Sequence, residues 1–433
     1  MTNLATNQID SSLHSARSTP AQRNENQRLA WPGTPFAQRT VALNHNALWM
    51  LWDRMMITDV FSDLEQEMRA IRTSVAIGDM SPLSKYEIRG PGAVALVDRV
   101  ITRDARRLEV GQTYYTPWCN EDGKLVNDGL VIRVDESTFR LSADPNLLWL
   151  SQCADGYDVE IEDLTEAFGI ITLQGPKSTE VLEAVTGAQW GDLRFSRLRQ
   201  TSIAGRQVDV LRQGFTGEVG YELWIPAADG VPVWDAVMNA GEPFGIKPAG
   251  ALAEDKARIE AGLLIVGYDY TAAGPDSQGA SVKVGSRYDA TPLELGMGRL
   301  IDFDKTDFIG KEALAREAAQ GSRTQHVGLD IDWRTIAREC DRRDIPPSDF
   351  VRVRWTPIPL AGEGVENRRA TSVTWSPTAR KLIGFGHVAP REARTGSTVS
   401  LLWPIGDDCV EVPATVVEPP FVTRRRSTSL SRK

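Results

Sequence analysis

The candidate chemical groups of this sequence are acidic residues that lie close to glycine. They occur in the runs Asn127-Asp128-Gly129, Gly220-Tyr221-Glu222 and Arg258-Ile259-Glu260-Ala261-Gly262. Because glycine has no side chain to screen the backbone, a neighbouring carboxylate can approach a bound ligand closely. These acids are therefore candidates for catalysis or for ligand binding.

Asp128, Arg258 and Glu260 also fit purely structural roles. Asp128 precedes a glycine, as turn residues often do. Arg258 and Glu260 fall on a predicted helix and fit a solvated helix face. Glu222 is different, because it lies in a predicted strand, where an inward carboxylate is costly unless it is paired or hydrogen-bonded to a ligand.

Self-contained catalytic motifs are absent from the sequence. It has no phosphate-binding loop, no G-x-S-x-G run and no H-E-x-x-H run, which disfavours most kinases and hydrolases. The cysteines and histidines are scattered, so neither a disulfide framework nor a metal site is predicted. They are Cys119, Cys153, Cys340 and Cys409, and His14, His45, His326 and His387.

Short predicted strands alternate with helices through the first three quarters of the chain. Apolar residues recur at near-helical spacing over Trp49–Arg72, which predicts amphipathic helix. Further helices are expected over Pro91–Val100, Ser178–Thr186, Val231–Ala240 and Ala249–Ala261. Strands are expected over Tyr86–Arg89, Gly129–Val134, Thr138–Ser142, Gly169–Gln174, Gln207–Arg212 and Tyr221–Ile225. Without regular βαβ spacing, this pattern predicts an α+β fold rather than a doubly wound sheet.

The pattern of apolar residues changes after about residue 320, where helical spacing is lost. Strands are predicted there at short intervals, over Val351–Arg354, Ala370–Trp375, Leu382–His387, Thr398–Trp403 and Glu411–Val417. We therefore divide the chain into a flexible arm (1–40), a catalytic region of two interleaved α+β domains (41–320), an all-β domain (321–423) and a basic tail (424–433).

Composition excludes several classes of protein. The 433 residues are 41% hydrophobic and carry a formal charge of -9, which disfavours binding to nucleic acid. No apolar run is long enough to span a membrane, and the polar start lacks the apolar core of a secretory signal. We expect a cytoplasmic protein, and no heptad run specifies an oligomer.

Eight segments, in order along the chain, resemble the folate-dependent aminomethyltransferase family, which includes the T-protein of the glycine cleavage system and tetrahydrofolate-dependent demethylases. The similarity extends from about Leu51 to Phe421. The segments are Ile77–Ala93, Gly111–Gly129, Leu173–Ser178, Arg212–Pro226, Arg258–Asp269, Thr291–Gly298, Asp307–Leu314 and Ile383–Pro390.

The resemblance implies a three-domain cloverleaf whose central channel binds tetrahydrofolate. Glu222 matches the family's pterin-binding glutamate, whose carboxylate accepts two hydrogen bonds from the amino-pyrimidinone edge. Asp128 matches the acid near the reactive pterin nitrogens, and Tyr115 matches a tyrosine that lines the same channel. Arg258 matches the arginine of the R-x-E-x-G run, which organises the site or meets an anionic group of the ligand.

The chain departs from the T-protein pattern on the substrate side. It has Asn127 in place of the first of two aspartates, Phe215 in place of a tyrosine, and an altered run Val266–Asp269. These changes resemble the demethylase branch. They favour a small methylated substrate, and an aryl methyl ether in particular. Tyr268 or Tyr115 would then assist departure of the leaving group. An aminomethyltransferase that works with a lipoyl carrier and a non-catalytic folate-binding regulator are the alternatives.

Overall fold

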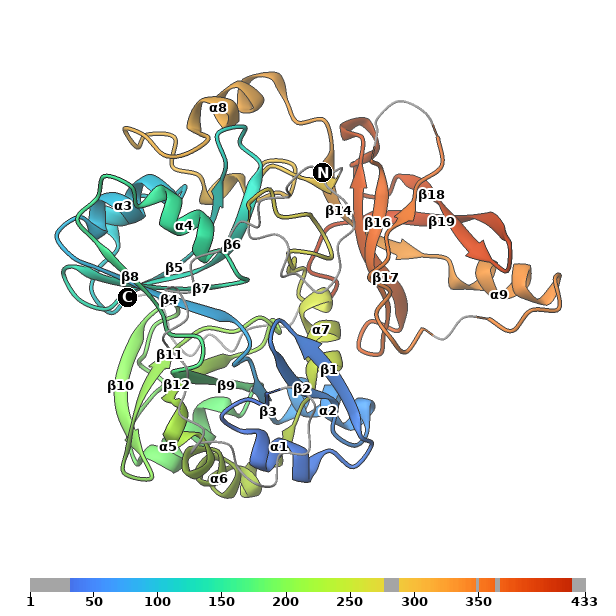
Figure 1. Cartoon of the computed structure of the whole chain (residues 1–433). Coiled ribbons are helices and arrows are strands. Elements are labelled where there is room, and N and C mark those ends of the chain that lie inside the picture. The colour runs from blue at the N-terminus through green and yellow to red at the C-terminus, as the bar shows by residue number, and fades with distance from the viewer. Residues whose placement is uncertain (1–31, 276–287, 348–349, 363–366, 423–433) are drawn as a thin grey trace, which may run out of the picture.

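Three β-sheets surround one central helix in the computed structural model, which describes residues 32–275, 288–347, 350–362 and 367–422. We call the sheets with their covering helices the first, second and third lobes (Figure 1). The central helix is α7 (Ala251–Glu260), which contacts strands of the first and third lobes. The α+β cloverleaf expected from the sequence is confirmed.

The first lobe is a six-stranded sheet in the order β10-β11-β12-β9-β3-β13. Helices α5 (Ser178–Thr186) and α6 (Gly230–Gly241) pack on it over a fully apolar core. Helices α1 (Ala37–Leu43) and α2 (Leu64–Thr73) complete the lobe. Its strands are β3 (Val75–Asp79), β9 (Phe168–Gln174), β10 (Leu198–Ile203), β11 (Arg206–Leu211), β12 (Gly220–Pro226) and β13 (Ile246–Pro248).

The second lobe is inserted between β3 and β9, so the first two lobes are interleaved along the chain. Its five strands follow the order β5-β6-β7-β4-β8, and its helices are α3 (Ala93–Val100) and α4 (Leu147–Cys153). Helix α8 (Lys311–Gln320) lies beside it in Figure 1. Its strands are β4 (Ser84–Arg89), β5 (Thr113–Cys119), β6 (Leu125–Arg133), β7 (Thr138–Ala143) and β8 (Glu160–Asp163).

The third lobe is an antiparallel sheet in the order β15-β16-β17-β14-β19-β18. A bridge between Leu360 and Leu401 brings its two edges together, so the sheet nearly closes into a barrel. Helix α9 (Trp333–Asp341) projects from it (Figure 1). Its strands are β14 (Gln325–Ile331), β15 (Ile358–Pro359), β16 (Arg369–Ser376), β17 (Lys381–Val388), β18 (Thr398–Ile405) and β19 (Asp408–Val417).

Two predicted elements differ from the structure. The segment Trp49–Val60 forms the hairpin β1 (Leu48–Trp52) and β2 (Met55–Val60), and only α2 is helical within the predicted stretch. Tryptophan, isoleucine and valine fit a pleated surface better than a helix, and the positive φ of Asp53 closes the turn. Val351–Arg354 forms no strand and pairs only through an isolated bridge from Arg354 to Val373.

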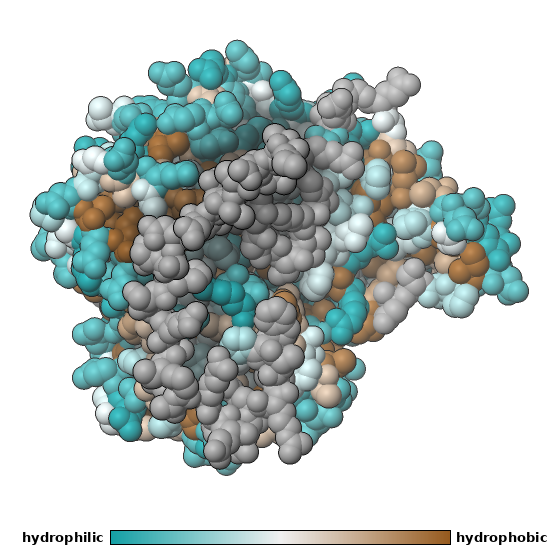
Figure 2. Space-filling model, viewed as in Figure 1, coloured by the Kyte–Doolittle hydropathy of each residue, from teal (hydrophilic) through white to brown (hydrophobic). Residues whose placement is uncertain are grey.

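The surface of the molecule is mostly hydrophilic on the side shown in Figure 2, with apolar side chains in separate patches. Within the described residues, none of the helices has the length and apolar character needed to cross a bilayer. Short 3-10 helices connect the larger elements at Ala105–Arg107, Ala227–Asp229, Glu242–Phe244, Gly298–Leu300 and Pro390–Glu392.

Buried ion pairs join α7 to the first and third lobes. Glu260 accepts hydrogen bonds from Arg72 of α2 at 2.7 Å and from Ser376 of β16 at 2.5 Å. Arg72 also donates to Glu218 at 3.1 Å, and all three charged groups are almost fully enclosed. Helix α7 therefore cannot shift without leaving a buried charge unpaired.

Replacing Arg72 by Met should lower the free energy of unfolding by about 3–5 kcal/mol, because the enclosed carboxylates of Glu260 and Glu218 would lose the cation that pairs with them. Urea unfolding followed by circular dichroism measures the loss. Arg69→Met on the same helix is the matched control, because Arg69 pairs with Glu65 in solvent, and it should cost no more than about 0.5 kcal/mol. Equal losses in both variants would contradict the interpretation.

Candidate active site

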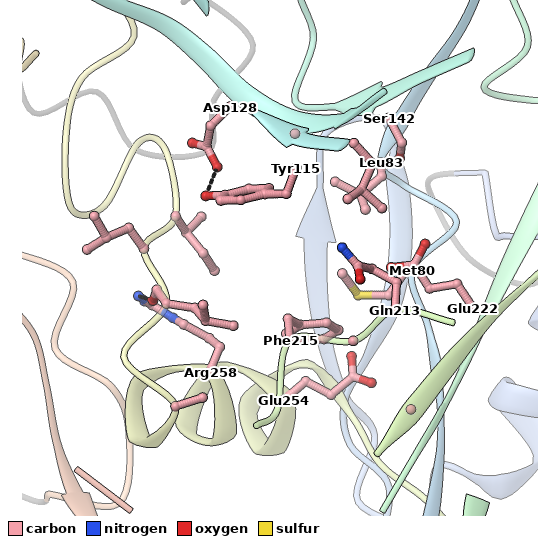
Figure 3. A pocket seen from close by; sticks show the side chains of 18 of the residues that line it. Met80, Leu83, Tyr115, Asp128, Ser142, Gln213, Phe215, Glu222, Glu254 and Arg258 are labelled. Carbon is pink, nitrogen blue, oxygen red and sulfur yellow. Dashed lines mark hydrogen bonds between the residues drawn. The ribbon is translucent and has the colours of Figure 1, made fainter. Parts of the chain in front are cut away.

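A cavity of about 960 Å³ lies where the lobes meet α7. Its volume is in the range of pockets that enclose a cofactor-sized ligand. Asp128, Tyr115, Tyr268, Glu222 and Arg258, the residues that the sequence singled out, all line it. Figure 3 shows Asp128 and Tyr115 on one side of this pocket, with Glu222 and Glu254 on the other. The cavity thus has two chemically distinct ends.

At the first end, two tyrosines hold the carboxylate of Asp128. Tyr115 Oη, on β5, donates to Asp128 Oδ2 at 2.5 Å (Figure 3), and Tyr270 Oη donates to Oδ1. Burial raises the pKa of Asp128, while the two tyrosine hydrogen bonds oppose that rise. Gly129 lets β6 pack here, because a Cβ atom at that position would lie 2.4 Å from the Ser142 carbonyl oxygen. The sequence did not single out Tyr270, although it lies two residues after Tyr268.

Tyr268 has a different position from Tyr270. Its ring stacks on Trp355 with centroids 4.8 Å apart and an interplanar angle of 22°. Trp355 donates in turn from its indole nitrogen to Asp255 at 2.7 Å. Tyr268 and Trp355 both line the cavity, so together they form an aromatic wall.

At the second end, Glu222 is buried on β12. Its Oε2 accepts a weak hydrogen bond of 3.4 Å from the Trp224 indole. Burial raises the pKa of Glu222 to about 7, although the charge of Lys85 opposes the rise. The pKa of Lys85 is itself lowered to about 7 by burial. A ligand with N–H donors would satisfy this carboxylate and favour its ionised form.

Arg258 is occupied by protein groups. Its guanidinium donates to Asp269 at 2.6 Å, to Asp255 at 2.8 Å, to Ser372 at 2.7 Å and to the Leu263 carbonyl at 2.9 Å. Asp269 directly precedes Tyr270, which holds Asp128. These contacts make Arg258 a positioning residue that fixes the segment behind the Asp128 end of the cavity.

The cavity also contains polar groups that the sequence did not reveal. Glu254 is buried on α7, and burial raises its pKa to about 8. Asp144 behaves similarly, because burial raises its pKa to about 7. Gln213 is buried, and its Oε1 has no hydrogen-bond partner in the described part of the chain. Gln213 lies in the family-like segment Arg212–Pro226, but the sequence did not single it out. Glu254 and Asp144 lie outside the eight segments, and tertiary packing brings them to the cavity.

Tetrahydrofolate fits this set of groups. A pterin offers N–H donors to the buried carboxylate of Glu222 and a polar edge to the unsatisfied amide of Gln213. Its anionic glutamyl tail would suit a basic rim. Arg194 and Arg299 supply such a rim, because both line the cavity and both are exposed.

The interleaved lobes surround one cavity, with Asp128 at one end and the buried carboxylate of Glu222 at the other. The family described as GCVT N-terminal domain matches residues 38–305. The chain belongs to this family, as expected from the sequence. The family uses tetrahydrofolate, which confirms the expected cofactor.

The similarity to known proteins covers most of the chain. The aminomethyltransferase of Moorella thermoacetica is 31% identical over 347 residues, which cover 79% of this chain and 86% of that protein. The aminomethyltransferase of Bacillus pumilus is 30% identical over 352 residues, with the same coverage. The glycine cleavage system aminomethyltransferase T from Bartonella henselae superposes with a TM-score of 0.74 at 20% identity, covering 92% of this chain and 99% of that one. The last comparison establishes the shared fold.

Replacing Tyr270 by Phe should raise the pKa of Asp128 further, because the ionised carboxylate loses a hydrogen bond that favours it. A hydrogen bond to a charged group contributes about 1.5–3 kcal/mol, so the pKa should rise by about one to two units. Titration of carbon-13-labelled aspartate by NMR, assigned with Asp128→Asn, measures the change. Tyr268→Phe is the control and should leave the pKa of Asp128 unchanged. If the pKa of Asp128 is also unchanged in Tyr270→Phe, the hydrogen bond from Tyr270 does not influence it.

Proposed function

We propose that this protein is an aminomethyltransferase that delivers a one-carbon unit from an aminomethyl donor to tetrahydrofolate. The observation that carries the proposal is the carboxylate of Asp128, held by Tyr115 and Tyr270 in the same cavity as Glu222. The similarity to aminomethyltransferases over most of the chain supports it. We expect the protein to act in the cytoplasm.

The proposed reaction is balanced without an oxidant. The aminomethyl carbon leaves its carrier and its amino group and becomes the methylene bridge of 5,10-methylenetetrahydrofolate, while ammonia and the reduced carrier are released. Tetrahydrofolate supplies the nitrogen atoms that accept the carbon. A carrier with a lipoyl arm would reach the cavity from the surface.

Asp128 would act as the proton acceptor in this reaction. A folate nitrogen that forms a new bond to carbon must lose a proton, and a half-buried carboxylate with a raised pKa is well suited to take it. Tyr115 and Tyr270 fix the carboxylate on both oxygens, so it need not reorganise during the transfer. Glu222 holds the other end of the ligand, which aligns the reacting atoms.

A second candidate is a tetrahydrofolate-dependent demethylase that takes the methyl group of an aryl methyl ether and forms 5-methyltetrahydrofolate. The aromatic wall of Tyr268 and Trp355 favours this candidate, because it could stack on an aromatic substrate. Tyr115, which donates to Asp128, and Tyr268, which stands in the aromatic wall, are the two candidates to assist a phenolate leaving group.

Product analysis separates these candidates. Purified protein is incubated with tetrahydrofolate and either an aminomethyl-lipoyl carrier or a panel of methoxylated aromatics, sulfonium compounds and methylated amines. Mass spectrometry that finds 5,10-methylenetetrahydrofolate only with the carrier supports the aminomethyltransferase. Formation of 5-methyltetrahydrofolate from a methylated substrate overturns it in favour of a demethylase. Folate binding without turnover across the whole panel identifies a regulator.

Replacing Asp128 by Asn should leave folding and tetrahydrofolate binding intact and lower kcat by about a hundredfold to ten-thousandfold, the usual contribution of a positioned acid or base. Steady-state kinetics with the productive donor measures the loss. Asp122→Asn, in the exposed turn between β5 and β6, is the control and should keep full activity. Near-normal turnover of Asp128→Asn would remove Asp128 from the mechanism.

A further inference from the structure

Glu254 is a second buried carboxyl group at the Glu222 end of the cavity, and the proposed transfer does not use it. Thr172 Oγ1 donates to Glu254 Oε1 at 2.8 Å. Thr172 is paired directly with Glu222 across strands β9 and β12. Residues paired in this way project from the same face of a sheet with Cβ atoms about 5 Å apart. The two carboxyl groups therefore flank one side chain, and both line the cavity (Figure 3).

Glu254 has one oxygen available for a ligand. Its side chain is buried, and within the described residues only Thr172 hydrogen-bonds to it. Glu254 also lines the cavity, so its carboxyl group can meet a ligand there. The carboxyl group packs directly against the backbone of Gly78, because a Cβ atom at that position would lie only 1.8 Å from Oε1. Oε2 is thus left for whatever occupies the cavity.

Burial raises the pKa of both glutamates, and the neighbouring charges act on the two pKa values in opposite directions. Asp79 of β3 and Glu67 of α2 face Glu254 and raise its pKa further. Lys85 of β4 acts on Glu222 in the opposite direction. Two carboxyl groups whose environments separate them in this way commonly take different roles, one as the ionised acceptor and the other as the neutral donor.

We propose that Glu254 is a second pterin-binding residue, which binds as the neutral acid and donates a hydrogen bond from Oε2 to the ring carbonyl of the ligand. The amino-pyrimidinone edge of a pterin presents an amino group and a ring N–H, followed by that carbonyl. Glu222 accepts from the first two groups, and Glu254 donates to the third. The two residues together hydrogen-bond to all three groups of this edge, whereas a single carboxylate can accept hydrogen bonds but cannot donate one to the carbonyl. The inference rests on tetrahydrofolate as the ligand but not on which one-carbon donor is used.

Affinity for tetrahydropterin, measured by calorimetry between pH 6 and 10 without any donor, tests this role. Wild-type affinity should rise as Glu222 ionises near pH 7, since the carboxylate is the better acceptor. It should fall again above pH 8, where Glu254 loses the proton that it donates. Glu254→Gln keeps a donor at every pH, so it should retain neutral-pH affinity and lose the alkaline decline. Lys85 and Asp144 also titrate near pH 7, but they are present in both proteins.

Glu254→Leu separates binding from structural damage. It should weaken tetrahydropterin binding at pH 7 by about tenfold to a hundredfold, the usual effect of leaving a buried partner unsatisfied, and leave binding of p-aminobenzoylglutamate unchanged. Equal weakening of both fragments, or an alkaline decline that persists in Glu254→Gln, would overturn the proposal. Glu312→Gln, on the exposed face of α8, is the neutral control.

Glu222→Gln checks where the pterin lies. It should weaken tetrahydropterin binding and remove the rise near pH 7. If it does not, the pterin lies elsewhere and the role of Glu254 fails with it. None of these measurements needs a one-carbon donor, so a failed transfer assay leaves the inference standing, and a failed binding test leaves the identity of the transferred group open to product analysis.

Discussion

The structure depends on the need to pair the charges that α7 carries into its interior. Charged groups are seldom buried without partners, because removing them from water costs several kcal/mol each. Three charged residues of α7 have partners outside the helix: Lys256 donates to Thr374, Glu260 accepts from Arg72, and Arg258 donates to Asp269. Hydrophobic burial alone would tolerate small sliding movements of the lobes, whereas these hydrogen bonds fix their positions. The short R-x-E-x-G motif therefore specifies how the lobes assemble.

The same pairing extends to the Asp128 end of the cavity. Arg258 fixes Asp269, whose other oxygen accepts from Thr371 and Ser372 of the third lobe. The next residue, Tyr270, holds Asp128 of the second lobe. Asp128 is thus oriented by a chain of hydrogen bonds that starts on the central helix. Tyr115, on the neighbouring strand β5, holds the other oxygen of Asp128. The orientation of this carboxylate therefore depends both on its own lobe and on the way the lobes assemble.

Sequence patterns predicted the elements that depend on local periodicity, and the family motifs predicted five residues that line the cavity. Helix α5 matches its predicted bounds, Ser178–Thr186. The hairpin that replaces predicted helix at Trp49–Val60 shows the limit of this reasoning. A short run of large apolar residues is compatible with the period of a helix or of a strand, and its tertiary contacts determine which one forms. Tyr270 and Glu254 were missed for a related reason. Their importance comes from contacts with Asp128 and Thr172, which are distant in the sequence, and nothing local distinguishes such residues from ordinary helix or loop positions.

The two ends of the cavity are built from different parts of the fold, and this division bears on donor specificity. The Glu222 end lies on paired strands β9 and β12, whose register fixes Thr172 and Glu222 together. The aromatic wall is a ring stack of Tyr268 on Trp355, anchored to α7 through the hydrogen bond from Trp355 to Asp255. Substitutions in that wall change which donor fits but leave the strand register untouched. The departures from the T-protein pattern at Phe215 and Val266–Asp269 fall on residues that line this cavity or adjoin it. Under the proposed function, the donor could therefore change while the strands that carry Glu222 stay the same.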